Sequence, residues 1–372
     1  MTAIPATMRA VLLTGHGGLD KLEFRPDWPV PKPGPGEVLI RVGACGLNNT
    51  DINTRTAWYA KSVREGTTAE GGAKGFSGVS DAGDWGGSGI TFPRIQGADV
   101  CGRIESLGEG APESLLGRRV LIDTWLRDWD DPLNLDRTGY FGSERDGGYA
   151  EFTTAPVANV HPIESGLSDI ELATFATSGV TALNMLNRGG VGAGDRVLIP
   201  GASGGVGSAL IQLCRARGAV PIALCGEAKA DAVRAVGAEE VLPRAPADLA
   251  AALRQATGHD RVDVVADVVG GPLWPQLIAV LRRGGRYTCA GAIAGPIVEL
   301  DLRTFYLNDL TFTGATIVPP GVFADLVGII ARREIRPLVA ATYPLEQLRE
   351  AQTAFLAKGF VGNIVIDLEA RA

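Results

Sequence analysis

The sequence contains few histidines and few cysteines, and its hydrophobic residues form no long uninterrupted run. The three histidines, at positions 16, 161 and 259, are scattered, so we assign none of them a catalytic role. The cysteines are widely spaced as well, the nearest pair being Cys214 and Cys225. Together with an N-terminus that lacks a signal-peptide pattern, this spacing indicates reduced thiols and a cytoplasmic protein. No apolar run approaches the roughly 18 to 20 residues that span a bilayer, which argues against a membrane protein.

Basic residues are outnumbered by acidic ones, with 35 Lys and Arg against 42 Asp and Glu and a net charge of −7. An acidic chain without a basic stripe is a poor candidate for binding nucleic acid. We therefore expect the partner to be a small-molecule substrate.

Glycine, in contrast, is abundant, with 50 residues among 372. The glycines follow no G-X-Y period, which excludes a collagen-like chain. Hydrophobic residues make up 45% of the sequence, enough to form a large core. At about 150 residues per domain, the length predicts two domains.

The two parts of the chain differ in their pattern. Before residue 168, short apolar runs such as 37–42 alternate with glycine and proline turns, which predicts a small β-barrel or sandwich without a long helix. From residue 168 onward, helical spacing alternates with short apolar strands, which predicts βαβ units and a parallel sheet. A helix is predicted over 168–188, with Ser168 and Glu171 at capping-box spacing.

A glycine-rich insertion, residues 66–89, interrupts the first part. Nine of its 24 residues are glycine, and it has almost no aliphatic side chains. This composition predicts that it cannot pack a core of its own. Two interpretations remain open, a mobile surface insertion or a lid over the active site.

The most informative segment is the glycine turn that follows the predicted strand 196–199. It reads Gly201-Ala202-Ser203-Gly204-Gly205-Val206-Gly207 and opens an amphipathic helix, the context in which such a turn binds a dinucleotide. We expect Gly204 to allow the tight turn, and Gly205 to let the pyrophosphate approach the helix N-terminus. Gly207 is expected to let helix and strand pack closely. A structural turn without a ligand is the alternative.

The end of the next strand bears on the choice between NAD and NADP. An acidic residue there would bind the ribose 2′-OH and favour NAD. Here the strand leads into Cys225 and Gly226, Glu227 comes slightly late, and Lys229 could reach a 2′-phosphate. The pattern favours NADPH. The alternative is that Glu227 and Lys229 are merely solvated residues at a helix start.

Several segments together resemble the medium-chain dehydrogenase/reductase family: the glycine turn, 147–152, 194–197, 263–271 and 284–291. The resemblance implies an α/β protein with a GroES-like β-rich catalytic domain, residues 1–166 and 317–372. A Rossmann doubly wound coenzyme domain with a parallel sheet, residues 167–316, lies between these two segments. The resemblance also implies a homodimer that pairs through the strand 310–317. The coenzyme contacts that it implies are Thr181, Ala202, Ser203, Gly204, Gly205, Val206, Gly226, Lys229, Val269, Ala290, Gly291 and Asn363.

Zinc alcohol dehydrogenases of this family carry a cysteine in a G-x-C-x-[ST]-D segment and a histidine in a G-H-E segment. This sequence has Asn48 and Ala98 at those positions, and the third ligand position, near 177–178, holds no cysteine. Neither an amide nor a methyl group is a zinc ligand, so we predict no zinc. The wide cysteine spacing likewise excludes the four-cysteine structural zinc lobe. Cys45 and Cys101 lie near the metal positions but out of register, and are expected to be buried apolar residues.

The segment around Asn48, Asp51, Arg55 and Tyr59 resembles the zinc-free branch of quinone oxidoreductases and enoyl reductases. This implies hydride transfer from NADPH to a quinone or to an activated C=C bond of enone, alkenal or acrylate type. Without a metal, hydrogen-bond donors must stabilise the developing negative charge, and Tyr59 and Asn48 are our catalytic candidates. The alternatives are structural roles without catalysis: an aromatic anchor at Tyr59 and a turn-forming amide at Asn48. A zinc-free alcohol dehydrogenase and a non-catalytic NADPH-binding sensor remain as alternative functions.

Overall fold

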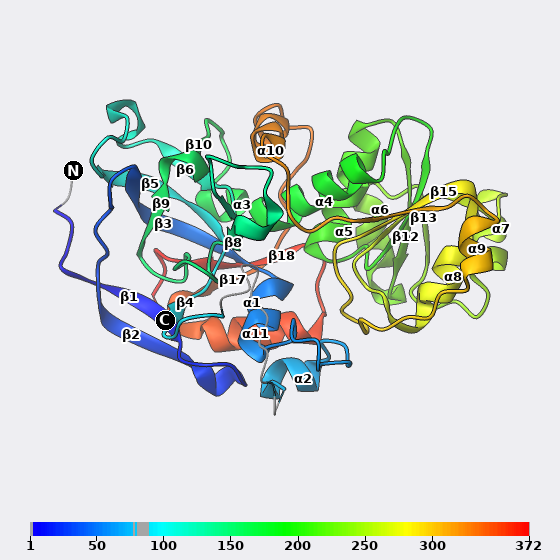
Figure 1. Ribbon diagram of the computed structural model, residues 1–372, viewed down its shortest axis with the longest axis horizontal. Coiled ribbons are helices and arrows are strands. Elements are labelled where there is room, and N and C mark those ends of the chain that lie inside the picture. The colour runs from blue at the N-terminus through cyan, green and yellow to red at the C-terminus, as the bar shows by residue number, and fades with distance from the viewer. Residues whose placement is uncertain (1–2, 77–78, 80–88, 372) are drawn as a thin grey trace.

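The computed structural model of the protein describes residues 3–76, 79 and 89–371. Figure 1 shows two lobes side by side, with both ends of the chain in the same lobe. The lobe without the chain ends contains a six-stranded sheet, and the other lobe is built mainly from antiparallel strands. The expected fold class, a GroES-like domain joined to a Rossmann-type parallel sheet, is confirmed.

The strands of the six-stranded sheet run in the order β13, β12, β11, β14, β15 and β16. Every neighbouring pair is parallel, as the alternation of helix and strand predicts. The strands are β11 (Arg196–Pro200), β12 (Val220–Cys225), β13 (Glu240–Pro243), β14 (Val262–Asp267), β15 (Leu281–Cys289) and β16 (Thr311–Gly314). The helices are α4 (Ala176–Arg188), α5 (Gly205–Ala216), α6 (Ala230–Val236), α7 (Leu249–Thr257), α8 (Trp274–Ala279), α9 (Leu302–Tyr306) and α10 (Val322–Ala331).

Helices cover both faces of this sheet because its central strands are apolar on both sides. On β11, Val197 and Ile199 pack into the core that contains α4 and α5, whereas Leu198 packs into the core that contains α7 and α8. All three side chains are completely buried. The sheet is therefore doubly wound, and the carboxyl ends of its strands lie together at one edge.

The other lobe joins the two ends of the chain in one sheet. The C-terminal strand β18 pairs antiparallel with β3, and β17 pairs parallel with β18. A smaller sheet of β2, β1 and β4 and a hairpin of β7 and β8 complete the strands. The bounds in the larger sheet are β3 (Glu37–Leu47), β5 (Asp99–Leu107), β6 (Arg119–Ile122), β9 (Phe152–Pro156), β10 (Val160–Pro162), β17 (Val339–Pro344) and β18 (Asn363–Asp367). The others are β1 (Thr7–Leu13), β2 (Leu22–Pro29), β4 (Arg94–Ile95), β7 (Trp125–Arg127) and β8 (Thr138–Tyr140).

One helix of this lobe, α1 (Asn49–Thr56), is absent from the sequence prediction. Its residues are almost all polar, so no apolar periodicity marks it. The helix is nevertheless buried from Asp51 to Thr56, and Arg55 has no exposed surface. The Arg55 guanidinium donates to the carbonyls of Gly17 and Gly72 and to Gln352 Oε1. Hydrogen bonds to the backbone and to an amide thus replace the apolar contacts that usually hold a buried helix.

The glycine-rich insertion is not a structureless loop where the structure describes it. A short helix, α2 (Ala69–Lys74), packs against α1 and against α11 (Leu348–Ala357). A Cβ on Gly72 would lie 2.2 Å from the Leu356 side chain, so this glycine lets the two helices approach closely. The prediction that the insertion packs no core of its own is not contradicted, because α2 packs against helices from other segments. Residues 77–78 and 80–88 lie outside the described residues.

The helix predicted over 168–188 is two helices, α3 (Asp169–Leu172) and α4. The Ser168–Glu171 capping box is confirmed at the first of them. A second helix can begin at Ala176 because the Asp99 carboxylate accepts a hydrogen bond from the backbone N–H of Thr177, in the first turn of α4, at 2.7 Å. A carboxylate from a distant strand therefore caps α4, which no local sequence pattern reveals.

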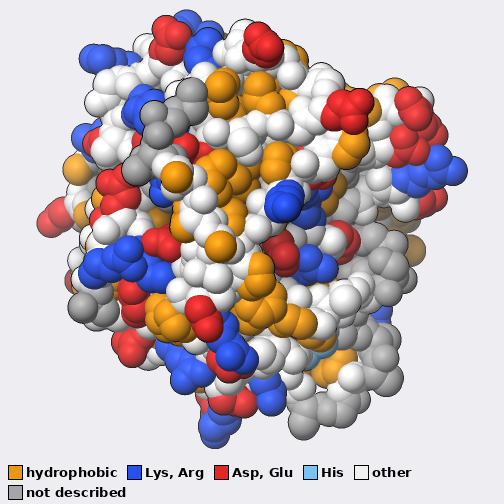
Figure 2. Space-filling view, turned by 90° about the vertical axis from the view of Figure 1, so that its left-hand side faces the viewer, with side chains coloured by type: hydrophobic (Ala, Val, Ile, Leu, Met, Phe, Trp, Pro, Cys, Tyr) orange, Lys and Arg blue, Asp and Glu red, His pale blue; other side chains and the backbone are white. Residues whose placement is uncertain are grey.

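We call the lobe that contains both chain ends the catalytic lobe, and the lobe with the six-stranded sheet the coenzyme lobe. The outer face of the catalytic lobe carries charges of both signs. Figure 2 shows its outer face, where Lys and Arg side chains alternate with Asp and Glu around apolar patches, without a basic stripe. Within the described residues, none of the helices is long and apolar enough to cross a membrane.

Candidate functional site

The glycine turn lies between β11 and α5, at the carboxyl edge of the sheet. Gly201 makes the sharp bend with a φ of +68°, whereas Gly204 has an extended backbone with a φ of −78°. The prediction that Gly204 supplies the tight turn is therefore wrong, and Gly201 does so instead. The nearest atom to a Cβ built on Gly204 is 3.6 Å away, so this position is open to an approaching ligand.

The next glycines are crowded by protein atoms. A Cβ on Gly205 would lie 2.3 Å from Asn363 Oδ1, so the absence of a side chain at Gly205 leaves room for Asn363 in this structure. This differs from the prediction, in which Gly205 makes room for pyrophosphate. A Cβ on Gly207 would lie 2.4 Å from the Gly201 carbonyl, in agreement with close packing of the helix on the turn.

The C-terminal strand of the catalytic lobe reaches the glycine turn. Gly204 and Gly362 form an isolated parallel bridge, and the Gly362 N–H donates to the Ser203 carbonyl at 2.9 Å. Asn363, which starts β18, is buried beside them. The turn, Ala202, Ser203 and Asn363 are thus brought together from segments 160 residues apart.

The remaining predicted coenzyme residues lie at the same sheet edge. Gly226 and Lys229 follow β12, Val269 follows β14, and Ala290 and Gly291 follow β15. Val269 packs over the bend, since one of its methyl groups would be 2.9 Å from a Cβ on Gly201. All five residues are partly exposed, as a ligand contact requires.

Helix α4 presents two threonines one turn apart. Thr177 and Thr181 are partly exposed, while Ser178, Val180 and Ala182 are buried. Thr177 bonds to Asp99 and Tyr140, as described below. Among the described residues, no hydrogen bond is found for the Thr181 hydroxyl, whereas Ser178 donates to the Thr174 carbonyl at 2.7 Å. The Thr181 hydroxyl is therefore available for a hydrogen bond to a ligand.

A chain of hydrogen bonds, which we call the catalytic corner, links Asn48, Asp99, Thr177 and Tyr140. Asn48 Nδ2 donates to Asp99 Oδ2 at 3.0 Å, and Asp99 Oδ1 accepts from the Thr177 backbone. The Tyr140 and Thr177 hydroxyls are 2.8 Å apart. These residues come from the start of α1, from β5, from α4 and from β8, so the corner exists only in the folded chain.

Tyr140 is a site residue that the sequence analysis missed. It is buried, and its ring packs edge-on against Trp125 at 5.0 Å between centroids. Burial, with Asp99 nearby, holds the pKa of Tyr140 well above its usual value, so its hydroxyl stays protonated. No motif surrounds it, and the only signal was the cluster of aromatic and acidic residues between Asp123 and Asp146.

Asp99 in this corner and Asp51 in the first turn of α1 are both buried, and within the described part of the chain neither forms a salt bridge. Burial raises the pKa of Asp99 to about 6, although Thr177 and Asn48 donate to it. Burial raises the pKa of Asp51 to about 7, against the lowering effect of hydrogen bonds from the Asn48 backbone and the Tyr149 hydroxyl. Both carboxyl groups therefore hold their protons to a higher pH than an exposed aspartate does.

Tyr59 lies just beyond the end of α1 and is only partly exposed. Its hydroxyl is 3.3 Å from Thr50 Oγ1, at the first turn of that helix, and its ring meets Trp58 edge-on. Burial raises the pKa of Tyr59, so it is a hydrogen-bond donor at neutral pH. The structure thus places Tyr59 near the Asn48 end of α1 but outside the hydrogen-bond chain of the catalytic corner.

The side chains of the corner do not suit a catalytic zinc ion. Zinc requires thiolate, imidazole or carboxylate ligands, and Asn48, Ala98 and Thr177 provide none. Among the residues that the structure describes, no group of three or more His, Cys, Asp and Glu side chains could hold a metal ion. Cys45 and Cys101 are buried, as expected, and burial raises both of their thiol pKa values well above normal.

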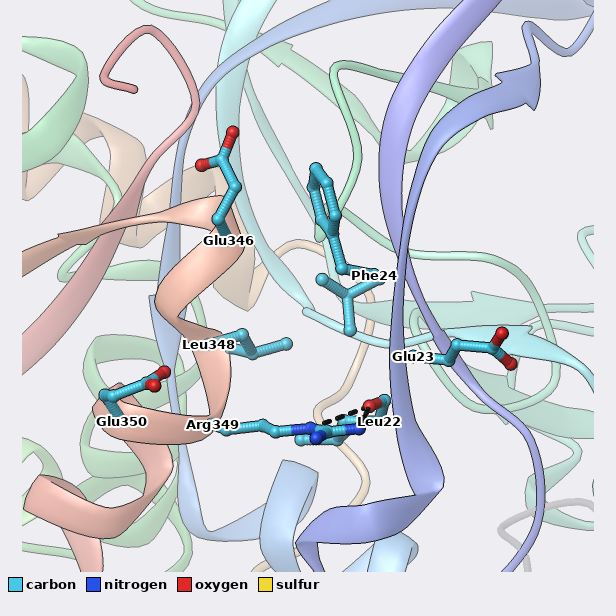
Figure 3. Close-up of a pocket in the computed structure, with 8 residues that line it drawn as sticks. Leu22, Glu23, Phe24, Glu346, Leu348, Arg349 and Glu350 are labelled. Carbon is cyan, nitrogen blue, oxygen red and sulfur yellow. Dashed lines mark hydrogen bonds between the residues drawn. The ribbon is translucent and has the colours of Figure 1, made fainter. Parts of the chain in front are cut away.

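A separate surface pocket lies between β2 and the start of α11. Figure 3 shows Phe24 and Leu348 pointing into it, and Arg349 donating to the Leu22 carbonyl across it. None of the candidate site residues lines this pocket. It is therefore separate from the catalytic corner.

Two family domains match the chain. Residues 34–165 match an alcohol dehydrogenase GroES-like domain, and residues 205–332 match a zinc-binding dehydrogenase domain. A solved structure from Sinorhizobium meliloti 1021, named as a candidate alcohol dehydrogenase, is 48% identical with a TM-score of 0.89, covering 99% of this chain and 98% of that one.

More distant relatives also match over nearly the full length. The quinone oxidoreductase of Rattus norvegicus is 26% identical over 96% of this chain and 97% of its own length. An NAD-dependent alcohol dehydrogenase of Sulfurisphaera tokodaii is likewise 26% identical, over 92% of this chain and 95% of its own length.

Proposed function

The chain belongs to the medium-chain dehydrogenase/reductase family, and from this premise we propose an NADPH-dependent, zinc-independent oxidoreductase that transfers hydride to a quinone or to an activated C=C bond of enone, alkenal or acrylate type. The observation that carries the proposal is the catalytic corner. Hydrogen-bond donors stand there, at the positions where zinc enzymes of the family have metal ligands.

The glycine turn and its surroundings fit a dinucleotide. The open side of Gly204 and the free N–H groups at the start of α5 would hold the pyrophosphate. Val269, Ala290 and Gly291 follow β14 and β15 at the same sheet edge as the turn, and Thr181 lies one helical turn after Thr177 on α4, so all four are proposed coenzyme contacts. When bound, the nicotinamide supplies the hydride.

The chain's own residues would stabilise the negative charge that develops on the substrate oxygen. When it is ionised, Asp99 can only accept hydrogen bonds, so it fixes Asn48 with its nitrogen toward Asp99 and leaves the second N–H for the substrate. The hydroxyls of Tyr140 and Thr177 form a second donor group next to it. Preorganised donors of this kind cost no reorganisation when charge develops. Tyr59 remains a proposed donor, with its hydroxyl beside Thr50 in the first turn of α1.

A second candidate function is zinc-free alcohol oxidation. The names of two relatives, from Sinorhizobium meliloti and Sulfurisphaera tokodaii, favour it. This reaction needs a base, and no histidine or lysine stands at a motif position to act as one. The structure offers Asp51 instead, whose pKa of about 7 suits proton transfer near neutral pH.

The deciding experiment measures NADPH consumption with a panel of quinones, alkenals and acrylate-type thioesters, and reduction of NAD and NADP with primary and secondary alcohols. We expect turnover with at least one electron-poor acceptor and NADPH. Activity only with NAD and an alcohol would favour the second candidate. Tight NADPH binding without turnover of any substrate would favour a sensor.

We also propose that the protein is a homodimer. The edge strand β16 is preceded in the chain by exposed apolar residues, among them Leu302, Tyr306 and Leu307. An edge strand beside such a surface is prone to pair with another copy. Sedimentation velocity of the wild type and of a Leu302→Glu/Leu307→Glu variant tests this, since only the wild type should sediment as a dimer.

A further inference from the structure

The hairpin that carries Tyr140 is too small to be stable on its own. Its strands, β7 and β8, have three residues each and form a separate two-stranded sheet. A hairpin of this kind is marginal in water, so contacts with the rest of the molecule must fix its position. The position matters because Tyr140 lies opposite Trp125 in the hairpin, and the Tyr140 hydroxyl is 2.8 Å from that of Thr177.

Arg127, the last residue of β7, makes such contacts from a buried position, with only 1% of its side chain exposed. Its Nη1 donates to Asp123 Oδ2 and to the Trp125 carbonyl, both at 2.9 Å. Its Nη2 donates at 2.5 Å to the carbonyl of Val318, which is completely buried in the segment between β16 and α10. One guanidinium group therefore joins the hairpin to a residue 191 positions later in the chain.

Helix α4 holds the same segment at the preceding carbonyl. The Ile317 carbonyl accepts from Arg188 Nη2 at 3.1 Å and from Asn184 Nδ2 at 3.4 Å. Both donors lie on α4, which carries Thr177 in its first turn. Two consecutive carbonyls thus accept from the hairpin and from α4. The elements that carry the Tyr140 and Thr177 hydroxyls are therefore bonded to one common segment.

The hairpin is also fixed at its other end. Asn159, which is 1% exposed, donates from Nδ2 to the Asp123 and Trp125 carbonyls, both at 2.9 Å. Trp125 begins β7, and Arg127 ends it. A three-residue strand that is held at one end can still turn about that point, whereas two anchors set its orientation. The bond to Val318 supplies the second anchor.

The burial of the Asp123–Arg127 ion pair indicates a positional role. Taking two charges out of water is unfavourable, and apolar side chains of similar volume often stabilise a fold equally well. A guanidinium differs from an apolar side chain because its donors lie in one plane and bond in fixed directions. Arg127 can therefore hold several acceptors at a set geometry.

We propose that Arg127 is a positioning residue for the catalytic corner. By bonding the hairpin of β7 and β8 to Val318, it keeps the Tyr140 hydroxyl within hydrogen-bond distance of Thr177. This inference rests on the proposed function, in which these two hydroxyls form the second donor group. The donor geometry then depends on a side chain that touches neither the substrate nor the coenzyme.

The first test is Arg127→Lys. The lysine keeps a positive charge beside Asp123, but one ammonium cannot reach Asp123, Trp125 and Val318 together. We expect kcat to fall by about tenfold with the substrate that the wild type turns over best. The Kd of NADPH should stay within about twofold, because the partners of Arg127 lie outside the glycine turn.

Two further variants complete the set. Arg127→Met/Asp123→Asn removes both charges, so neither is left buried without its partner, and kcat should fall by about 10- to 100-fold. Arg137→Lys is the matched control, since Arg137 is an exposed cation of the loop between β7 and β8 that pairs with Asp128. It should change neither kcat nor the Kd.

A double-mutant cycle with Tyr140→Phe separates positioning from a general structural effect. If Arg127 acts through the Tyr140 hydroxyl, Arg127→Lys should change kcat by less than about twofold in the Tyr140→Phe background. An equal loss of kcat in both backgrounds, or no loss in either, overturns the inference and leaves the proposed function standing.

Amide hydrogen exchange supplies a measurement that needs no turnover. Peptides covering residues 125–141 should exchange faster in Arg127→Lys than in the wild type, whereas peptides covering α5 should not. Unchanged exchange over 125–141 overturns the positioning role. If exchange rises there but the wild type reduces no acceptor, the proposed function and the catalytic meaning of the hairpin are wrong, while its attachment through Arg127 stands.

Discussion

In the proposed function, the glycine turn and the catalytic corner both stabilise negative charge, but they do so with different parts of the chain. The glycine turn would do so with backbone N–H groups at the start of α5, within a segment of seven consecutive residues of which four are glycine. The catalytic corner uses side chains of Asn48, Asp99, Tyr140 and Thr177, which are spread over 130 residues of sequence. The comparison indicates that the first site depends on local conformation and the second on the packing of both lobes.

The largest effect is expected from adding a single methyl group inside the glycine turn. In Gly207→Ala, the new Cβ would lie 2.4 Å from the Gly201 carbonyl and 2.6 Å from Ala202 Cα, and this backbone cannot move aside cheaply. We expect the free energy of unfolding to fall by about 3 kcal/mol and coenzyme binding to be lost. Urea unfolding and NADPH titration measure the two quantities.

Gly204→Ala is the matched control for this prediction. Its backbone is extended and its Cβ would make only an ordinary contact, 3.6 Å from the Gly201 carbonyl oxygen, so the free energy of unfolding should change by about 0.5 kcal/mol or less. Coenzyme binding should still weaken, by about tenfold, because the methyl group lies where the pyrophosphate is expected. A destabilised Gly204→Ala, or a neutral Gly207→Ala, would reverse the roles assigned to the two glycines.

The next largest effect concerns the donors of the catalytic corner. Asn48→Ala and Tyr140→Phe each remove one donor, and we expect kcat to fall by about 100-fold in each variant. The Kd of NADPH should not change, because neither side chain lies at the glycine turn. Stopped-flow reduction of the best acceptor, with thermal unfolding as the check on folding, measures the effect.

Tyr59→Phe is the comparison that separates the sequence-based candidate from the structural one. Tyr59 bonds to Thr50 and stands outside the hydrogen-bond chain, so its loss should reduce kcat less than the loss of Tyr140. A larger loss in Tyr59→Phe than in Tyr140→Phe would return the donor role to Tyr59.

The sequence predicted the features that depend on local conformation. The alternation of helix and strand, the glycine turn and the Ser168–Glu171 capping box are all confirmed, because each has a periodic or short-range signal. The polar helix α1 was missed because its burial depends on hydrogen bonds of Arg55 to distant carbonyls. Tyr140 was missed because only folding brings it to Thr177, and no pattern in the sequence encodes that contact.

A third prediction uses the buried carboxylate of Asp51. Its folded-state pKa of about 7 exceeds the unfolded value of about 3.9, so the folded state binds more protons between these two pH values. The contribution of Asp51 to stability is therefore fully present below pH 4 and is lost as pH rises through 7. Relative to the wild type, Asp51→Asn should gain about 2 kcal/mol of stability between pH 5 and pH 8.

Urea unfolding at both pH values measures this difference. Asp27→Asn, at an exposed position of β2, is the control and should show the same pH dependence as the wild type. If the stability of Asp51→Asn relative to the wild type does not rise with pH, the Asp51 carboxyl is not held in a raised-pKa environment. Asp51 would then be a poor candidate for the base that alcohol oxidation requires.

The smallest effect is expected from two threonines that lie one turn apart on α4. Thr181 is a proposed coenzyme contact, and Thr177 belongs to the catalytic corner. Thr181 has a partly exposed hydroxyl, whereas the Thr177 hydroxyl is 2.8 Å from that of Tyr140. Loss of one neutral hydrogen bond to the coenzyme in Thr181→Val should raise the Kd of NADPH by about 3- to 10-fold and leave kcat unchanged. Thr177→Val keeps the backbone N–H that Asp99 accepts and removes the hydroxyl, with its contacts to Tyr140 and Asp99, so it should lower kcat by a similar factor without changing the Kd. Steady-state kinetics with direct NADPH titration separates the two outcomes. If both variants changed the same parameter, the coenzyme site and the catalytic corner would have to be treated as one site, and the division between backbone and side-chain stabilisation of charge would not hold along this helix.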